Sequence, residues 1–322
     1  QVAFGDIKSG TSIIQTNDFF LVQRGDELYS KTPFDLPPLL PDWGFTWDST
    51  GLAASDNVIN FSWTGARSYA GDIPPQIRFS GGAVYYLGAS GKISLTPSEI
   101  PTTGTATVIG TILIDFSFTS SKGLVTCGDN PVSVGYMSNS IDGSSSFGQG
   151  IFAYCTKLTT APIALKPNTM LGAFANSPLV NSSLAAWDVS QVKSFSQTFS
   201  GATAFNQDIS SWDVTSATNM ASMFRNATSF NKNLQAWGPN TGNVTSFTGM
   251  FSGASGYNQP MNDWDTSGTT SSTALNRMFN NATIFSQPLT NWCVTYATSE
   301  PTDFSAGSAL TNAQLPIWGT CP

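Results

Sequence analysis

Tryptophan recurs at a nearly constant interval through the second half of this chain, and this repetition restricts the folds that the sequence can adopt. Successive tryptophans are 25, 25, 27, 28 and 26 residues apart. Two further columns keep the same register, one of phenylalanine and one that is mostly aromatic. A period in the twenties is typical of solenoids, whose short coils bury their apolar edges only by stacking on one another. The three columns are Trp187, Trp212, Trp237, Trp264, Trp292 and Trp318; Phe174, Phe199, Phe224, Phe251, Phe279 and Phe304; and Val180, Phe205, Phe230, Tyr257, Phe285 and Leu310.

One repeat contains two different apolar spacings. In Ile209–Val214 the pattern is L-x-x-L-x-L, and its last two apolar positions alternate as they do in a strand. In Ala217–Ala227 the apolar residues lie three or four apart, which is the spacing of one helix face. Thr215 or Ser216 would cap that helix. We therefore expect each coil to contain a strand, a short helix and a segment that leads back to the next strand. The tryptophan column would then run along the centre of the stacked core.

The phrase FNQDISSWDVTSATNMASMF (Phe205–Phe224) resembles the BspA-like leucine-rich repeats of bacterial surface proteins and mycoplasmal lipoproteins. The resemblance covers about residues 150–322, and Ile151–Leu165 has the shape of a shorter coil of that family. It implies a surface-exposed protein that binds or adheres and that has no catalytic motif position. The expected fold class is mostly β plus an α/β solenoid: a small β-rich N-terminal domain, then a BspA-like leucine-rich-repeat solenoid with a C-terminal cap.

The segment Thr16–Pro38 contains two strand-like runs around a Gly25-Asp26 turn signal, which predicts a β-hairpin. Its pattern resembles a short module near the N-terminus of structural proteins of tailed phages, including cyanophages, and this resemblance implies attachment to a virion. An amphipathic hairpin of any β domain is the alternative. Pro33–Pro41 (PFDLPPLLP) is stiff linker material. We expect residues 1–40 to form a virion-attachment hairpin and a proline-rich linker.

Residues 41–126 contain short strand-like runs separated by turns. Strands at intervals of about eight to twelve residues are typical of a small sandwich or barrel. The same strands are equally compatible with an irregular N-terminal cap of the solenoid, and the sequence leaves both arrangements open. The solenoid is expected over residues 127–322. The strand-like runs are Asp56–Trp63, Pro75–Ser80, Ala83–Gly88, Lys92–Leu95 and Ala106–Phe118.

Composition argues against several classes of function. The net charge is -7 and the pI is near 4.4, whereas nucleic-acid binding requires a basic face. No apolar run is long enough to span a bilayer. The chain has no histidine, which removes the usual general base and the commonest metal ligand. We therefore expect no enzyme activity, no cofactor, no metal site, no nucleic-acid partner and no membrane partner.

Acidic residues follow three of the column tryptophans, at Asp188, Asp213 and Asp265. Carboxylates clustered on one face can bind Ca²⁺ or act as an acid–base pair. An aspartate just before a helix is more simply explained as a cap or a dipole partner, and we interpret these residues in that way. The outward face of the coils is then small, polar and mildly acidic, and it is the candidate contact face. Its members are Asp188, Ser190, Ser211, Asp213, Thr215, Asn240, Asp263 and Asp265.

Two of the four cysteines fall on neighbouring coils near the C-terminus. Cys293 lies one residue after a column tryptophan and Cys321 lies three after the next, so both would point to the same face, two residues out of register. A diagonal of ~7 Å is at the limit for a disulfide, but a chain end can adjust, and we expect this bond. Cys155, from its position in the BspA-like coil, is expected to be a buried thiol. Cys127 has no clear partner.

Together these patterns predict a non-enzymatic surface protein of a phage virion, of the capsid-decoration or tail-fibre type. The N-terminal segment would contact other virion proteins, and the solenoid would contact a host-surface glycan or protein. We also expect a homo-oligomer. The alternative is an adhesin on a bacterial cell surface, which accounts for the repeats but not for the phage-like N-terminal pattern. A polysaccharide-degrading enzyme is disfavoured, because no spaced carboxylate pair lies outside the structural columns.

Overall fold

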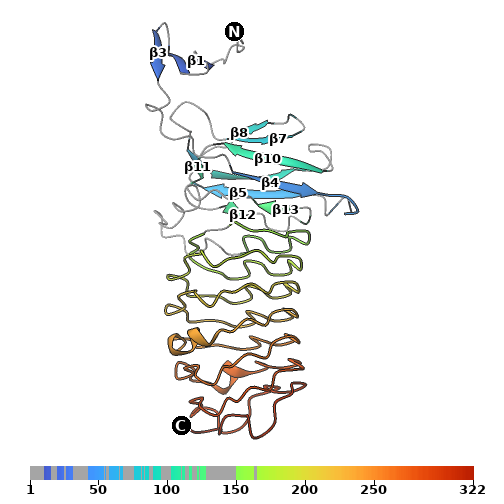
Figure 1. Cartoon of the computed structure of the whole chain (residues 1–322), viewed down its shortest axis with the longest axis vertical. Helices are drawn as coiled ribbons and strands as arrows, with labels where there is room; N and C mark the ends of the chain where they lie inside the picture. The colour runs from blue at the N-terminus through green and yellow to red at the C-terminus, as the bar shows by residue number, and fades with distance from the viewer. Residues whose placement is uncertain are drawn as a thin grey trace.

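The computed structural model shows a long molecule with sheets at its N-terminal end and a stack of coils that extends from them to the C-terminus (Figure 1). The proline-rich linker expected at Pro33–Pro41 lies outside the residues that the structure describes. Those residues are 11–15, 20–24, 27–31, 43–53, 55, 58–64, 66–67, 76–80, 82, 84–86, 90–95, 103–109, 111–112, 116–117, 122, 124–127, 150–162 and 165–322.

The first three strands form an antiparallel sheet of their own. They are β1 (Thr11–Gln15), β2 (Phe20–Arg24) and β3 (Glu27–Lys31). β2 and β3 correspond to the two strand-like runs of the N-terminal segment, and they pair with Arg24 opposite Glu27. In Figure 1 this sheet lies at the end of the molecule away from the C-terminus.

The β-rich region contains three further groups of antiparallel strands. A five-stranded sheet has the order β13-β4-β10-β7-β8, a three-stranded sheet has the order β12-β5-β9, and β6 pairs with β11. The strands are β4 (Trp43–Asp48), β5 (Ile59–Thr64), β6 (Ala66–Arg67), β7 (Gln76–Phe79), β8 (Val84–Tyr86), β9 (Ser90–Leu95), β10 (Thr103–Ile109), β11 (Thr111–Ile112), β12 (Phe116–Ser117) and β13 (Leu124–Cys127).

The core of the β-rich region is continuous with that of the coils. Alternation along β4 directs Phe45 and Trp47 inward, and both are buried. Trp47 meets Phe79 of β7 edge to face, with ring centroids 5.3 Å apart. On the first coil, Lys157 Nζ lies 3.3 Å from Asp48 Oδ2. The strands therefore cover the N-terminal end of the stack.

The coils consist of tight turns, and two local predictions for them are wrong. The strand expected at Ile209–Val214 is absent, and so is the helix expected over Ala217–Ala227. Parallel bridges instead join the coils after the tryptophan, where Asn219 pairs with Ser194 on one side and with Ser246 on the other. The described coils contain two short 3₁₀ segments, η2 (Gln235–Asn240) and η3 (Ser272–Leu275).

Backbone hydrogen bonds explain why an apolar spacing of three and four gives turns here. The Phe199 N–H donates to the Met223 carbonyl of the next coil, 2.8 Å away, while the N–H before it donates to a carbonyl three residues back. Gln197 and Gly201 have φ values of 58° and 74°. Two left-handed residues, four positions apart in each coil, redirect the chain before i→i−4 bonds can form. Similar turns therefore repeat, and their apolar residues face the core as those of a helix would.

The second left-handed position alternates between asparagine and glycine from Asn176 onward, whereas the first coil has Tyr154 there. A Cβ added to Gly201 would lie 2.8 Å from Asn176 Oδ1, and one added to Gly307 would lie 2.5 Å from Asn281 Oδ1. Each of these asparagine side chains therefore fills the space beside a residue that has no side chain. The column is Asn176, Gly201, Asn226, Gly253, Asn281 and Gly307, all with φ between 55° and 74°.

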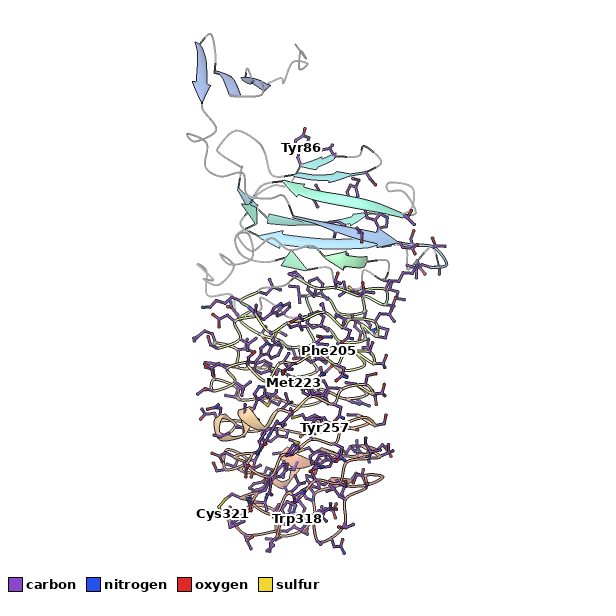
Figure 2. The ribbon with its side chains drawn as sticks, viewed as in Figure 1. Tyr86, Phe205, Met223, Tyr257, Trp318 and Cys321 are labelled. Atoms are coloured by element: carbon purple, nitrogen blue, oxygen red, sulfur yellow. A yellow bond between two sulfur atoms is a disulfide. The ribbon has the colours of Figure 1, made fainter. Side chains whose placement is uncertain are left out.

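Two aromatic columns form the continuous centre of the stack. Phe251 and Phe279, on neighbouring coils, are parallel within 2°, with ring centroids 5.9 Å apart. Within one coil, Phe199 stacks on Phe205 of the other column at 3.9 Å. Figure 2 shows Phe205 and Tyr257 inside the stack. Ring stacking therefore links the coils both along the stack and within each layer.

The tryptophans lie beside this centre. Trp212 and Trp237 are parallel within 7° at 6.3 Å, whereas Trp264 is tilted by 42° from Trp237. The Trp212 Nε1 donates a 2.9 Å hydrogen bond to the Leu184 carbonyl of the preceding coil. The more continuous ring stack is thus that of phenylalanine, and tryptophan adds a hydrogen bond between coils. Trp187, Trp212, Trp237, Trp264 and Trp292 are at most 3% exposed, and Trp318 is partly buried.

A ladder of asparagines adds hydrogen bonds along the stack. Asn181 Oδ1 accepts the Asn206 N–H at 2.9 Å, and Asn206 Oδ1 accepts the Asn231 N–H at 3.0 Å. Asn231 Oδ1 likewise accepts the Asn258 N–H at 3.0 Å. Each asparagine therefore fixes the register of the following coil.

The C-terminal coil is closed by a disulfide between Cys293 and Cys321, whose Cα atoms are 4.0 Å apart. Figure 2 shows Cys321 and Trp318 at the end of the stack. Cys155 is a buried free thiol. Cys127 belongs to β13, and its side chain lies outside the part of the chain that the structure describes.

Candidate functional site

The aspartates that follow the tryptophans hold the turns in which they lie. Asp213 Oδ1 accepts the Thr215 N–H at 3.0 Å. Asp188 Oδ1 accepts the N–H and the hydroxyl of Ser190, at 3.1 Å and 2.7 Å. Asp265 Oδ1 accepts the N–H two residues further on, at 2.9 Å. These are Asx turns, so the side chains cap turns where the sequence predicts that they cap helices.

Hydrogen bonds to these carboxylates lower their pKa. The Lys166 ammonium, whose Nζ lies 2.7 Å from Asp188 Oδ2, is the first cause of the lowered pKa of Asp188, and Ser190 is the second. Hydrogen bonds from Thr215 hold the pKa of Asp213 below its usual range. Both carboxyls therefore remain ionised and bound to their partners at neutral pH, which does not suit a general acid.

The other members of the candidate contact face are engaged with neighbouring coils or simply exposed. Asp263 Oδ2 accepts a 2.9 Å hydrogen bond from Gln235 Nε2, and the Ser211 hydroxyl lies 3.5 Å from the Ala185 carbonyl oxygen. Asn240 is exposed. Among the described residues, no group of three or more His, Cys, Asp or Glu side chains is arranged to hold a metal ion. The same residues include no helix of the length and apolarity that crossing a membrane requires.

A groove crosses the turns that flank the phenylalanine column, at a place that the repeat pattern of the sequence did not predict. Its volume is about 370 Å³. Its residues come from four successive coils, so the groove runs along the stack. The lining residues are Ser222, Arg225, Thr248, Gly249, Ser252, Arg277, Asn280 and Asp303.

Gly249 explains why the surface is hollowed here. It occupies the first left-handed position of its coil, with φ of 60°, and Ser222 and Arg277 occupy the same position on the two adjacent coils. The nearest atom to a Cβ added at Gly249 would be Ser222 Oγ, at 3.4 Å. The side chains of Ser222 and Arg277 therefore border a gap where Gly249 contributes none.

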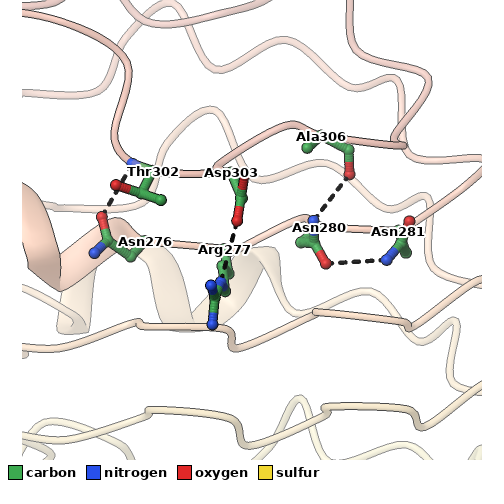
Figure 3. A network of polar contacts seen from close by, with 7 residues as sticks. All are labelled: Asn276, Arg277, Asn280, Asn281, Thr302, Asp303 and Ala306. Atoms are coloured by element: carbon green, nitrogen blue, oxygen red, sulfur yellow. Dashed lines mark hydrogen bonds and ion pairs between the residues drawn. The ribbon is translucent and has the colours of Figure 1, made fainter.

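A polar network fixes the C-terminal end of the groove (Figure 3). Arg277 Nε donates to Asp303 Oδ2 at 3.2 Å, and the arginine side chain is 64% exposed. Asn280 Nδ2 donates to the Ala306 carbonyl at 3.3 Å, and its Oδ1 accepts from Asn281 Nδ2 at 3.0 Å. Since the ion pair engages Nε, the terminal nitrogens of Arg277 are left to donate elsewhere.

Arg225 adds a second guanidinium to the groove. It makes no side-chain hydrogen bond or ion pair with any residue that the structure describes. A guanidinium presents five N–H donors and stays charged at every pH that the protein meets. Together with the hydroxyls of Ser222 and Ser252, the two arginines give this groove the chemistry of an anion-binding surface.

The sequence contains a weak signal for the groove. Arg225 follows Phe224 by one residue, and Arg277 precedes Phe279 by two. These are different positions of the repeat, so an alignment of the repeats does not place the two arginines together. The available signal is that both flank the phenylalanine column, on coils separated by the one that carries Gly249.

Comparison with known protein families matches two stretches, residues 137–240 and 238–318, to the family described as "Mycoplasma protein of unknown function, DUF285". The two matches together span more than half of the 322 residues and include the groove. This family is found in BspA-like surface repeat proteins of Mycoplasma and Bacteroides. Neither the curated proteins nor the solved structures gave a match to the chain.

Proposed function

The chain belongs to the DUF285 family, and from this premise we propose that it is a non-enzymatic surface protein of a phage virion, of the capsid-decoration or tail-fibre type. Its coils are a BspA-like leucine-rich-repeat solenoid that adheres to the host surface or to neighbouring virion proteins. The N-terminal sheet joins the chain to the particle, and the assembled protein is a homo-oligomer.

The groove is the observation that carries the adhesive role. The aromatic columns are buried and hold the coils together, so contacts with a partner fall to the outward polar residues. No residue that the structure describes pairs with the Arg225 donors, and Asp303, the one carboxylate among the described lining residues, is bound to Arg277. Such groups bind a partner without forming or breaking bonds in it.

The virion location rests on the N-terminal segment. β2 (Phe20–Arg24) and β3 (Glu27–Lys31) carry the pattern that resembles the module of phage structural proteins. The disulfide between Cys293 and Cys321 supports a location outside the cytosol, since such bonds persist in oxidising surroundings.

The family favours a second candidate, an adhesin on the surface of a bacterial cell, because DUF285 repeats are found in bacterial surface proteins. Both candidates give the coils the same adhesive role. They differ in what carries the chain, a phage particle or a cell envelope.

Locating the protein distinguishes the two candidates. An antibody against the full chain would be used for immunogold imaging of purified phage particles and of intact cells, with mass spectrometry of both fractions. We expect peptides and label on the capsid or tail. Label confined to the cell envelope would replace the virion proposal by the adhesin. Shortening of a host surface polysaccharide by the purified chain would refute a non-enzymatic role.

A further inference from the structure

We propose that the groove between Ser222 and Asp303 binds a saccharide chain that carries carboxylate groups, such as a uronic acid polymer, with Arg225 and Arg277 as its two cationic anchors. This inference rests on the proposed adhesive function and specifies the chemistry of the partner.

The groove contains two guanidinium groups on a stack that is not basic. The stack as a whole is not basic, since the chain from residue 150 onward carries six Lys and Arg against seven Asp and Glu. Two of those six basic residues nevertheless line this one groove. The planar fork of a guanidinium matches a carboxylate with two parallel hydrogen bonds. No residue within the described ranges engages the fork of Arg225, and the ion pair of Arg277 with Asp303 uses Nε and not its terminal nitrogens.

The acid at the end of the groove restricts the anion. Asp303 lies beside Arg277 with its Oδ2 3.2 Å from Nε. A second negative charge here repels a doubly charged phosphate more strongly than a singly charged carboxylate. The groove therefore suits a monoanion better than a doubly charged phosphate monoester.

The shape and lining indicate a saccharide chain. Residues 222, 249, 277 and 303 lie on four successive coils, so the groove extends over three coil steps, or roughly 15 Å at about 4.8 Å per step. This length accommodates a few sugar units. Ser222, Ser252 and Asn280 add hydroxyl and amide groups, which match the hydroxyls of sugars. Eight residues line the groove, whereas each partner contributes about 20–30 residues to a stable protein interface. It also lacks the aromatic side chains on which nucleic-acid bases stack.

Binding at one groove is expected to be weak. The Arg277 side chain is 64% exposed, so water and salt screen its attraction for a carboxylate. Many copies on one surface would raise the overall affinity for a polymer that repeats the same carboxylate.

The test uses the purified full chain and trigalacturonate, with its methyl ester as the neutral probe of the same length. Calorimetric titration at low salt should detect the acid and not the ester. Arg225→Gln should weaken binding roughly threefold, and the Arg225→Gln/Arg277→Gln pair roughly tenfold. Gly249→Asn places a side chain on the floor of the groove in a residue type that tolerates positive φ, so it should also weaken binding. Lys193→Gln, at an exposed position outside the groove, is the matched control and should bind as the parent does.

Several results would overturn the inference. These are equal binding of the ester, no binding of the acid, an effect of Lys193→Gln as large as that of Arg225→Gln, or tighter binding of a glycerol phosphate oligomer or a glutamate peptide. Thermal melting of each variant separates lost binding from lost folding.

The outcome is independent of where the protein is displayed. Cell attachment that survives Arg225→Gln, with no uronate binding, would end this inference and leave the adhesive function standing. Uronate binding by a chain that is absent from particles and from cell surfaces would refute the adhesive function and leave the groove as a uronate site.

Discussion

The Asn/Gly column makes a quantitative prediction for Gly253→Ala. Gly253 has φ of 71°, a conformation that an alanine adopts at a cost of about 1–2 kcal/mol. Its added methyl group would also fall directly on Asn226 Oδ1 of the preceding coil. The asparagine side chain must then move, and forcing extra atoms into a packed space costs a further ~1–3 kcal/mol. We expect Gly253→Ala to lower the free energy of unfolding by about 3 kcal/mol in total.

Two further variants separate the backbone cost from the steric cost. Gly249→Ala lies on the same coil with a similar φ of 60°, but its nearest neighbour, Ser222 Oγ, would be at an ordinary 3.4 Å. It should therefore show the backbone cost alone, about 1–2 kcal/mol. Adding Asn226→Gly to Gly253→Ala removes the atom that collides, so this pair should recover about 1–2 kcal/mol relative to the sum of the single changes.

Urea unfolding followed by tryptophan fluorescence measures the parent, Gly249→Ala, Gly253→Ala, Asn226→Gly and the double variant, since the buried tryptophans report on the coils. If Gly253→Ala and Gly249→Ala were equally mild, the asparagine would not occupy the space assigned to it. A strictly additive double variant would lead to the same conclusion.

Three other changes test separate features. Tyr257→Phe should raise the free energy of unfolding by about 1 kcal/mol in urea titration, because the buried hydroxyl has no hydrogen-bond partner in the part of the chain that the structure describes; a loss would mean that the hydroxyl is bonded. Asp188→Asn should reduce the acid sensitivity of the melting temperature. The pKa of Asp188 is lowered in the folded protein, so the stability that the carboxylate contributes is complete above the ordinary value of 3.8 and is lost as the pH falls through the folded value. An unchanged profile of melting temperature against pH would contradict this. Trp237→Ala should cost ~3–5 kcal/mol, whereas the exposed Asp213→Ser should cost under ~1 kcal/mol; equal melting temperatures would refute the core position of the ring.

Repetition in the sequence located the buried columns but not the backbone path between them. Ala217–Ala227 has the apolar spacing of a helix face, and the structure produces the same spacing from turns. The information lay in residues that the helical interpretation ignored, namely Gly201, Gly253 and the asparagines that alternate with them. Glycine and asparagine are the residues that most readily adopt positive φ. Gln197 and Arg277, which also have positive φ, give no such signal.

The sequence pointed to the candidate contact face and not to the groove, and the reason is related. The aspartates after the tryptophans are recognisable because they recur, and residues that recur in a repeat protein are most often those that build the repeat. The structure accordingly finds Asp188 and Asp213 holding their own turns. Arg225 and Arg277 each occur once, at unequal positions of the repeat. Only the stacking of the coils brings them to one groove, so their proximity required the three-dimensional arrangement.

The alternation of asparagine and glycine has a consequence for how such chains change in length through recombination. Loss of one coil would leave two asparagines facing each other at the junction, or two glycines with an empty space between them. Loss of two coils, roughly fifty residues, restores the original neighbours. Natural variants that gain or lose coils between Asn176 and Gly307 should therefore do so in even numbers.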